Sequence, residues 1–398
     1  MIKDLIKKEA RRQKKVINLI PSENYVSKNV LAALGSPLTN KYAEGKSHQR
    51  YYFGNEVVDE LEDEVKRLVL KVFKISSEEW GVNVQPYSGS IANMAAYLAS
   101  VNVGDKILAM SLEHGGHLTH GHHVSWTGKL FKFEHYGVGH DGWLDYDGIA
   151  KIAKEFKPAL IVCGATAYPR QLDFKKFKEI SDSVGALLMA DISHIAGLVV
   201  GGVHPSPFPY ADIVTTTTQK TLRGPRGAII ISAKRPRPYA NGGSGKTKNE
   251  KEILSDAIDK AVFPGLQGGP QVHTIAAMGV ALEEAIKPSF KKYAKQIVNN
   301  AKKLSEELGR LGFKIVSGGT DNHLLLVDVT PLGLTGGEAG SKLEKAGIIV
   351  NKNMIPFDTR KPWDPSGIRL GTPAVTTQGM KEKDMVKIAE EISTILKQ

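Results

Sequence analysis

Two short apolar runs with a helical pattern between them constrain the fold more than any other feature. Residues 159–164 (ALIVCG) and 186–191 (ALLMAD) have the length and composition of buried strands. The apolar residues between them recur at helical spacing: Phe174, Phe177, Ile180 and Val184. Another amphipathic helix is expected over residues 147–156. This alternation predicts right-handed crossovers and an α/β fold with a mainly parallel sheet.

The length of 398 residues favours two domains. We predict an N-terminal arm over residues 1–40, a large domain over 41–279 and a smaller α+β domain over 280–398. The last contains the short apolar strands FKIVSG and HLLLVDV and a final helix at 380–397. Residues 234–252 are rich in Pro, Gly and Lys, which predicts an exposed loop.

The composition indicates the cellular compartment of the protein and the kinds of partner that it can bind. No apolar run reaches the roughly 18 residues of a membrane span, and residues 1–15 lack the apolar core of a secretory signal. Cys163 is the single cysteine, so no internal disulfide forms, and we expect a cytoplasmic protein without a membrane partner. The net charge of +11 permits nucleic-acid binding, but no RNA-binding aromatic signature accompanies it. A solvated helix face is the simpler interpretation, and a nucleic-acid partner is not expected.

Two residues at strand ends suggest cofactor chemistry. Lys220 follows the polar β-branched run TTTTQ and precedes a turn rich in Gly and Pro. A lysine at a strand end can lose enough hydration to act as a Schiff-base amine, although a surface lysine is the plainer alternative. Asp191 ends the strand 186–191, where its carboxylate can hold a pyridinium nitrogen protonated or cap the next helix.

Two further segments fit the same cofactor. Ser88, Gly89 and Ser90 in PYSGSIANM precede a helix and offer N–H and hydroxyl donors to a phosphate. The segment 114–123 (HGGHLTHGHH) holds five histidines, which suggests a metal site. However, no cysteine and no HExxH pattern lies nearby, and its glycines indicate close backbone approach. We therefore expect an imidazole stacked on a cofactor ring, and no metal.

Long blocks of the sequence resemble those of the serine hydroxymethyltransferase family. They run in the family's order from about residue 17 to 378: INLIPSENYVS, LTNKYAEG, RYYFGNE, SGSIANM, HGGHLTHG, DISHIAGL, VTTTTQKTLRGPRG, AVFPGLQGGP, SGGTDNHLLLVD and SGIRLGTPA. The resemblance implies a fold-type-I pyridoxal-phosphate transferase, with a seven-stranded type of sheet. It also implies a homodimer whose active sites are shared between subunits.

The resemblance assigns roles to individual residues. The implied catalytic residues are Lys220, which forms the Schiff base, Glu44, His117, Asp191 and Tyr52. The implied cofactor-binding residues are Ser88, Gly89, Ser90, His117, Thr166, Asp191, His194, Gln219, Lys220, and Gly268 and Gly269 from the second subunit. The implied substrate-binding residues are Ser22, Tyr42, Glu44 and Arg369. The implied folate-binding residues are Leu112, Gly116, Leu118 and Asn353.

The implied reaction moves the hydroxymethyl carbon of serine to tetrahydrofolate, leaving glycine. Two alternatives stay open: a folate-independent pyridoxal-phosphate aldolase acting on β-hydroxy amino acids, and tetrahydromethanopterin as the carrier. Some positions depart from the family pattern. Gln219 stands where histidine is usual, Ile91 replaces a glutamine, and Pro21 replaces an alanine. Glu113 lies among the expected pterin contacts, where a small residue is common.

Overall fold

The structure is a computed structural model that describes residues 1–236 and 252–398. Residues 237–251 of the predicted exposed loop lie outside the described residues. The main sheet has seven strands in the order β4-β10-β9-β8-β7-β5-β6. Their bounds are Trp80–Asn83, Ala228–Ala233, Ile213–Thr217, Leu187–Asp191, Leu160–Gly164, Lys106–Met110 and Lys132–Tyr136. The strands from β9 to β6 are parallel to one another, and β10 is antiparallel to β9 and β4. The predicted mainly parallel sheet is confirmed.

Both faces of this sheet are buried, and the period of two residues along a strand explains how. In β7, Ile161 and Cys163 belong to one hydrophobic cluster, whereas Leu160 and Val162 belong to another. The same alternation occurs in β5 and β8. A strand covered on both faces must be apolar at every position, which is why these strands appear as continuous hydrophobic runs.

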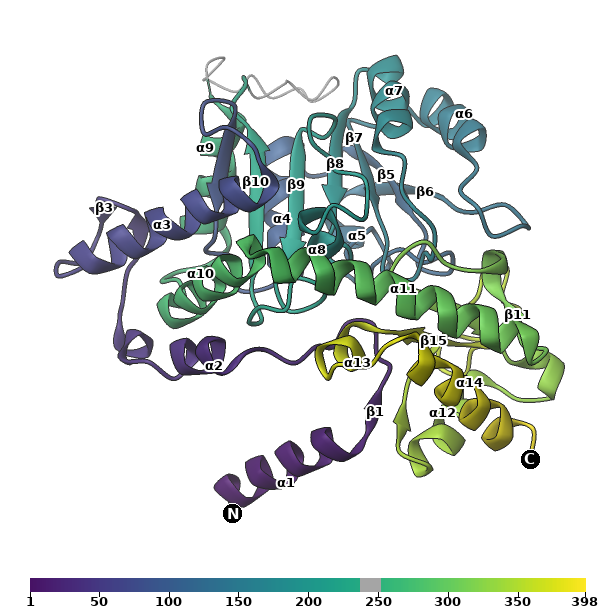
Figure 1. The fold of residues 1–398 in the computed structure, drawn as a ribbon. Helices are drawn as coiled ribbons and strands as arrows, with labels where there is room; N and C mark the ends of the chain where they lie inside the picture. The colour runs from purple at the N-terminus through teal and green to yellow at the C-terminus, as the bar shows by residue number, and fades with distance from the viewer. Residues whose placement is uncertain (237–251) are drawn as a thin grey trace.

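Helices cover the two faces (Figure 1). One cluster includes residues of α3 (Glu56–Phe73), α6 (Tyr146–Phe156), α7 (Phe174–Val184), α8 (Ala196–Val200), α10 (Val272–Ile286) and α11 (Pro288–Arg310). The other includes α4 (Gly89–Ser100) and α9 (Leu254–Lys260), with α5 (Trp126–Leu130) beside them. Figure 1 shows α10 and α11 in front of the sheet and α4 and α5 behind it.

The helices predicted from spacing form with local caps. The side chain of Asp173 accepts a hydrogen bond from the backbone N–H of Lys176 at the start of α7, as an N-cap residue does. Gly185 ends the same helix at φ +68°, a left-handed conformation that glycine adopts without a side-chain clash. Asp145 caps α6 in the same way as Asp173 caps α7. Local sequence therefore sets the ends of both crossover helices.

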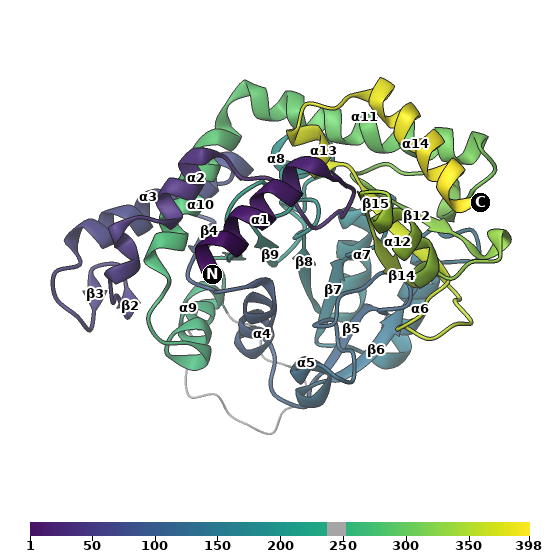
Figure 2. The same ribbon diagram turned by 90° about the horizontal axis from the view of Figure 1, so that it is seen from below.

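A second, antiparallel sheet lies in the C-terminal part, in the order β11-β12-β15-β14. The elements of this part are β11 (Lys314–Ile315), β12 (Leu324–Asp328), α12 (Gly336–Lys345), β13 (Ile348–Ile349), β14 (Asn351–Asn353), β15 (Gly367–Gly371), α13 (Pro373–Thr377) and α14 (Glu382–Leu396). Figure 2 shows this sheet with α12 and α14 at one end of the molecule and α3 with the hairpin of β2 (Gly45–Lys46) and β3 (Gln49–Arg50) at the other. Helix α11 joins the two parts, because Phe290 and Ala294 pack in the main cluster and Leu304 and Leu308 in the C-terminal one.

The N-terminal residues divide between an exposed helix and attached segments. Helix α1 (Ile2–Lys15) has no buried residue and projects from the body in Figure 1. In contrast, β1 (Ile17–Asn18) pairs in parallel with β13, and α2 (Lys28–Leu34) packs Val30 against α10. The boundaries predicted at residues 40 and 279 stay predictions. Among the described residues, no helix combines the length and hydropathy needed to span a bilayer.

Candidate active site

The predicted Schiff-base lysine and its carboxylate lie at the carboxyl ends of adjacent parallel strands. Asp191 is the last residue of β8, and Thr217 is the last residue of β9. The Lys220 ammonium donates a hydrogen bond of 3.1 Å to the Thr217 hydroxyl. Ligands of parallel sheets bind at this edge, so the chain brings these groups to the expected place.

Asp191 is a buried carboxylate held in its ionised form. Its Oδ2 accepts a 2.9 Å hydrogen bond from Asn93 and lies 3.3 Å from His120 Nε2, while Oδ1 accepts from the Ser193 backbone N–H at 3.0 Å. Burial raises the pKa of Asp191, but the hydrogen bonds from His120, Asn93 and Ser193 outweigh burial and hold the pKa well below its usual range. The pocket therefore contains a fixed negative charge.

The lysine is also perturbed. Burial lowers the pKa of Lys220 from 10.5 to about 8, because desolvation disfavours the ammonium and the nearby guanidinium groups of Arg369 and Arg226 repel it, while Asp191 acts in the opposite direction. A substantial fraction of this amine is neutral at mildly alkaline pH. A neutral amine is the form that attacks an aldehyde.

The start of α4 offers free donors to a phosphate. Ser88 is the N-cap residue of α4, and its side chain makes no capping hydrogen bond. No acidic residue occupies the first turn, where Gly89 and Ser90 lie. A Cβ added to Gly89 would lie 2.7 Å from Thr217 Cγ2, so glycine lets this helix approach the end of β9. Unpaired N–H groups and the positive end of the helix dipole suit an anion here.

His117 is a neutral ring fixed by its neighbours. Its Nδ1 lies 2.7 Å from the Thr119 hydroxyl and accepts from the Thr119 backbone N–H at 3.2 Å. Burial, followed by the charge of His120, lowers the pKa of His117 to about 4. The expected close backbone approach is present, because a Cβ on Gly116 would lie 2.1 Å from the Met110 carbonyl oxygen.

Among residues 1–236 and 252–398, no three His, Cys, Asp or Glu side chains are arranged to hold a metal ion.

Arg369, in the middle of β15, is a buried cation without an anionic partner. Its guanidinium donates to Asn351 Oδ1 at 3.0 Å and to the Thr166 carbonyl at 2.5 Å. No ion pair to Arg369 forms among the described residues, and burial lowers its pKa to about 10. The segment before Ser22 is held beside β15, because Gly371 N–H donates to the Leu19 carbonyl, and Ser22 lines the same pocket as Arg369. An unpaired buried guanidinium is a site prepared for a carboxylate.

One pocket of about 470 Å³ gathers most of the predicted residues. The predicted residues that line it come from segments as far apart as residues 22 and 369: Ser22, Ser88, Gly89, Ser90, Leu112, Gly116, His117, Leu118, Thr166, Asp191, His194, Gln219, Lys220, Asn353 and Arg369. The amide oxygen of Gln219 is buried with no hydrogen-bond partner among the described residues. Three groups in this pocket have binding capacity left over: the amide oxygen of Gln219, the guanidinium of Arg369, which has no anionic partner, and the uncapped N-terminus of α4. They fit a bound phosphorylated cofactor and an amino acid.

The other predicted residues form a separate group. Tyr42, Glu44, Tyr52, Gly268 and Gly269 do not line this pocket. The Tyr42 and Tyr52 ring centroids are 4.8 Å apart, and the Glu44 carboxylate raises the pKa of Tyr42. Gly268 and Gly269 lie against Glu44 and Tyr42, respectively. These five residues converge in space, but they lie outside the set that lines the pocket of Lys220 in the same chain.

Sequence reasoning missed several residues at the site. Asn93 and His120 bind Asp191, and Thr217 binds Lys220, yet none of the three was predicted. Asn93 and His120 stand inside the quoted blocks SGSIANM and HGGHLTHG, and Thr217 stands inside VTTTTQK. Their positions in these blocks are a signal that could have found them. Their partners depend on tertiary packing.

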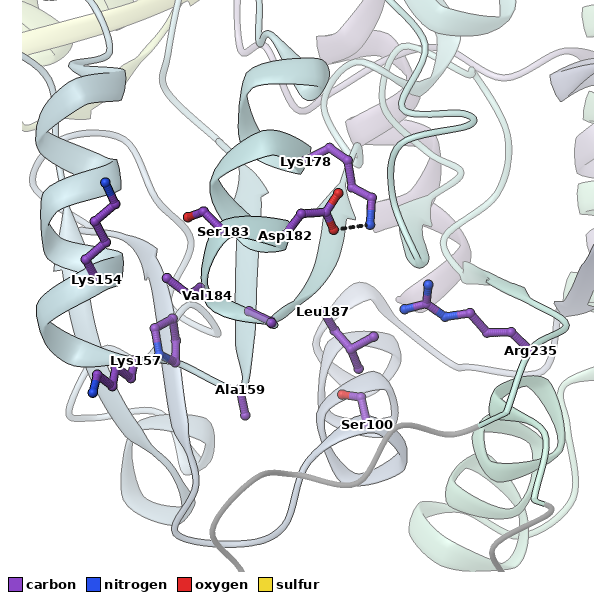
Figure 3. Close-up of a pocket in the computed structure, with 13 residues that line it drawn as sticks. Ser100, Lys154, Lys157, Ala159, Lys178, Asp182, Ser183, Val184, Leu187 and Arg235 are labelled. Carbon is purple, nitrogen blue, oxygen red and sulfur yellow. Dashed lines mark hydrogen bonds and ion pairs between the residues drawn. The ribbon is translucent and has the colours of Figure 1, made fainter.

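A larger hollow of about 640 Å³ lies elsewhere, lined in part by Lys154, Lys157 and Ser100 (Figure 3). Two of its lining cations are already paired. Lys178 lies 2.7 Å from Asp182, and Arg235 lies 2.7 Å from Asp212. None of the residues predicted for catalysis lines this hollow. This hollow is larger than the pocket around Lys220, but it lacks the groups that the reaction needs.

Comparison with known proteins decides the family. The family model described as serine hydroxymethyltransferase matches residues 1–392. This chain belongs to the serine hydroxymethyltransferase family. It is also similar to the serine hydroxymethyltransferase of Methanosarcina barkeri (strain Fusaro / DSM 804), with 55% identity over 394 residues that cover 99% of this chain and 90% of the relative. Members of this family are fold-type-I enzymes that use pyridoxal phosphate and a tetrahydrofolate-type carrier. Both features agree with the expectations from the sequence.

The lowered pKa of Lys220 predicts a pH dependence for cofactor loading. Above a pKa of about 8 the amine is mostly neutral, so the rate at which the apoenzyme takes up pyridoxal phosphate should rise toward that pH and then level off. An ordinary lysine would give a rate still rising toward 10.5. Stopped-flow absorbance measures the rate, and Lys220→Ala should show no covalent uptake. A rate that rises without a plateau above pH 8 would contradict the lowered pKa.

The unpaired guanidinium predicts a loss of substrate affinity in Arg369→Lys. Lysine keeps the charge but not the two-pronged donor geometry, so the KM for serine should rise by about 10- to 100-fold, the range for charged hydrogen bonds. The visible absorbance of the bound cofactor should stay unchanged. Arg360→Lys, at an exposed arginine paired with Asp364, is the matched control. An unchanged KM in Arg369→Lys would remove the proposed carboxylate contact.

Proposed function

We propose that this chain moves the hydroxymethyl carbon of serine to tetrahydrofolate, leaving glycine, in the pocket that contains Lys220, Asp191 and Arg369. One observation carries the proposal. The same pocket contains Lys220, whose pKa is lowered, and Arg369, a buried cation without an anionic partner. An amino acid presents both an amine and a carboxylate. The family assignment and this pairing of groups agree with each other.

The described residues fit pyridoxal phosphate. When bound, this cofactor supplies an aldehyde that reacts with amines and a protonated ring that accepts the electron pair of a broken bond to carbon. Lys220 would supply the amine, and the fixed charge of Asp191 would hold a proton on the ring nitrogen. Ser88, Gly89 and Ser90 would bind the phosphate at the start of α4. Thr166 and His194 line the same pocket, and the Thr166 carbonyl accepts a hydrogen bond from Arg369.

Orientation is the chief contribution of Arg369 and His117. The guanidinium fork can donate two parallel hydrogen bonds to the substrate carboxylate, with Ser22 beside it. The neutral His117 ring presents a flat face whose tilt is fixed by Thr119. Holding the amino acid at both its carboxylate and its amine would fix its orientation in the pocket. Orientation of this kind can contribute a large share of a rate enhancement.

The carrier binds at the mouth of the same pocket in this proposal. Leu112, Gly116, Leu118 and Asn353 line that pocket together with Lys220. Leu118 is 46% exposed, so an apolar surface is available to a flat pteridine ring. A pteridine bound there would lie close to the departing carbon. The comparisons do not favour the folate-independent aldolase or the tetrahydromethanopterin alternative.

A homodimer would complete the site. The group of Tyr42, Glu44, Tyr52, Gly268 and Gly269 stands apart from the pocket of its own chain, and highly exposed aromatic side chains surround it. Phe53 is fully exposed, and Tyr51 is 74% exposed. Large exposed apolar side chains of this kind mark interaction surfaces. We infer that each subunit places its Glu44 group over the pocket of the other, where Glu44 handles the proton of the substrate hydroxyl.

The proposed location is the cytoplasm. Cys163 is buried and unpaired, which suits a reducing compartment. Serine, glycine and a folate-type carrier are small soluble molecules, so the proposal needs no membrane partner.

The reaction is tested by serine cleavage with and without a carrier. The purified holoenzyme should form glycine from serine rapidly when tetrahydrofolate is present and slowly without it. Glycine formation is followed by chromatography, with tetrahydromethanopterin as the comparison carrier. Equal rates with and without tetrahydrofolate would favour the aldolase. A rate that depends on tetrahydromethanopterin alone would replace the proposed carrier.

Site sharing is tested by mixing two inactive variants. Lys220→Ala lacks the amine and Glu44→Gln lacks the acid, so each homodimer should be nearly inactive. If the two residues act across the interface, a heterodimer contains one intact site. Random mixing should then restore about a quarter of the wild-type activity, because half the dimers are mixed and each has one of two sites intact.

The mixing must allow subunits to exchange, which a mass-tagged subunit verifies. Activity that stays at the level of the separate variants after verified exchange would show that Lys220 and Glu44 act within one chain. The holoenzyme of Glu44→Gln should keep its cofactor absorbance, since Lys220, Asp191 and the start of α4, which would hold the cofactor, are unchanged.

A further inference from the structure

A second histidine lies behind the pocket and contacts a pocket residue. His194 Nδ1 is 3.0 Å from Nε2 of His323, which directly precedes β12. Both rings are buried, and His323 is fully so. The backbone of His323 is anchored, because its carbonyl accepts from the Thr372 N–H at 3.0 Å. Residue 322 is also fixed, since the Asn322 amide donates to the Tyr168 carbonyl at 3.0 Å. The contact between the two histidines is therefore set by the fold.

The other nitrogen of His323 and a nitrogen of a third histidine are buried without partners. Among the described residues, His323 Nδ1 and His204 Nε2 make no hydrogen bond. His204 follows α8, and its Nδ1 lies 2.9 Å from the Pro205 carbonyl. A carbonyl only accepts, so this Nδ1 carries the proton. Burial lowers the pKa of His204 to about 4, so the ring is neutral and its Nε2 is an acceptor.

Both unpaired nitrogens belong to residues that line one small cavity. Its lining includes His194, His204, His323, Asp191 and Asn322, and its volume is about 10 Å³. This volume is close to the smallest that holds one water molecule, and a buried water needs two to four polar partners. Two orphaned imidazole nitrogens at a cavity of this size are costly unless a partner satisfies them.

We propose that one ordered water molecule bridges His323 and His204 and that this bridge positions the His194 ring in the active site. The water donates to His204 Nε2. It either accepts from His323 Nδ1–H or donates to His323 Nδ1, according to the tautomer of His323. Both arrangements satisfy every nitrogen, so the site suits a water molecule better than an ion.

The bridge acts on the pocket through the tautomer of His194. When His323 Nδ1 carries its proton, His323 Nε2 is an acceptor, and His194 must donate from Nδ1. His194 Nε2 is then an acceptor. His323 and His204 are thus positioning residues, since neither lines the pocket of Lys220. This inference extends the proposed function, because it needs His194 to lie beside the substrate, but the water itself does not depend on catalysis.

A crystal structure of the holoenzyme at a resolution that shows ordered water tests the bridge. We expect a water peak within about 2.7–3.2 Å of both His323 Nδ1 and His204 Nε2. Solid-state NMR of the same crystals, with nitrogen-15 in histidine, should show His194 and His323 in the same tautomer, because one of their two facing nitrogens must donate and the other must accept. A cavity without a peak, or a peak bonded to only one of the two nitrogens, would overturn the proposal. These readouts stand even if serine turnover fails to appear.

Two variants test the effect on the pocket. His204→Phe removes the acceptor, so kcat should fall about three- to tenfold, the factor for losing one hydrogen bond, while the KM for serine changes little. His204→Gln places an amide oxygen near the lost nitrogen and should recover most of kcat. The exposed His123→Phe is the matched control. Equal kcat values for wild type and His204→Phe, or a loss that His204→Gln shares fully, would refute the positioning role. If His204→Phe does not fold, the water peak and the matched tautomers of His194 and His323 in the wild-type protein still decide the question.

Discussion

The site depends on one constraint: its charged groups are buried away from water at one edge of the sheet. Transferring an ionised group into a protein interior costs several kcal/mol unless other groups compensate. Asp191 receives that compensation from Asn93, His120 and Ser193, and so remains an anion. Lys220 and Arg369 receive little, and their pKa values fall to about 8 and about 10. The protein thus buries two basic groups with little compensation for their charge. A substrate carboxylate would pair with the guanidinium, and a cofactor aldehyde would react with the amine.

Much of this arrangement could be predicted from the sequence, because it follows from short-range rules. The apolar runs 159–164 and 186–191 became β7 and β8, and the spacing from Phe174 to Val184 became α7. Carboxyl ends of parallel strands meet at one edge, so the end of a strand already placed Asp191 near Lys220. The pocket then gathered most residues that the family resemblance implied, although their individual roles stay predictions.

The remaining features depend on contacts between distant parts of the chain. Asn93 and Asp191 are 98 residues apart, and His194 and His323 are 129 apart. No local pattern distinguishes these residues from ordinary core or cap residues. The five residues around Glu44 pose a different difficulty. Their sequence blocks indicate a shared reaction, but they do not line the pocket of Lys220 in the same chain. The homodimer proposed above would bring them to that pocket.

Helix α11 has a consequence for how the protein unfolds. It contributes Phe290 and Ala294 to the core beneath the main sheet, and Leu304 and Leu308 to the core of the C-terminal sheet. Melting either half of this helix removes apolar packing from the other half, since helix formation propagates along the chain. The two sheets should therefore lose their order together in one cooperative transition. The placement of Arg369 relative to Lys220 therefore depends on α11 as well as on the hydrogen bond from Arg369 to the Thr166 carbonyl.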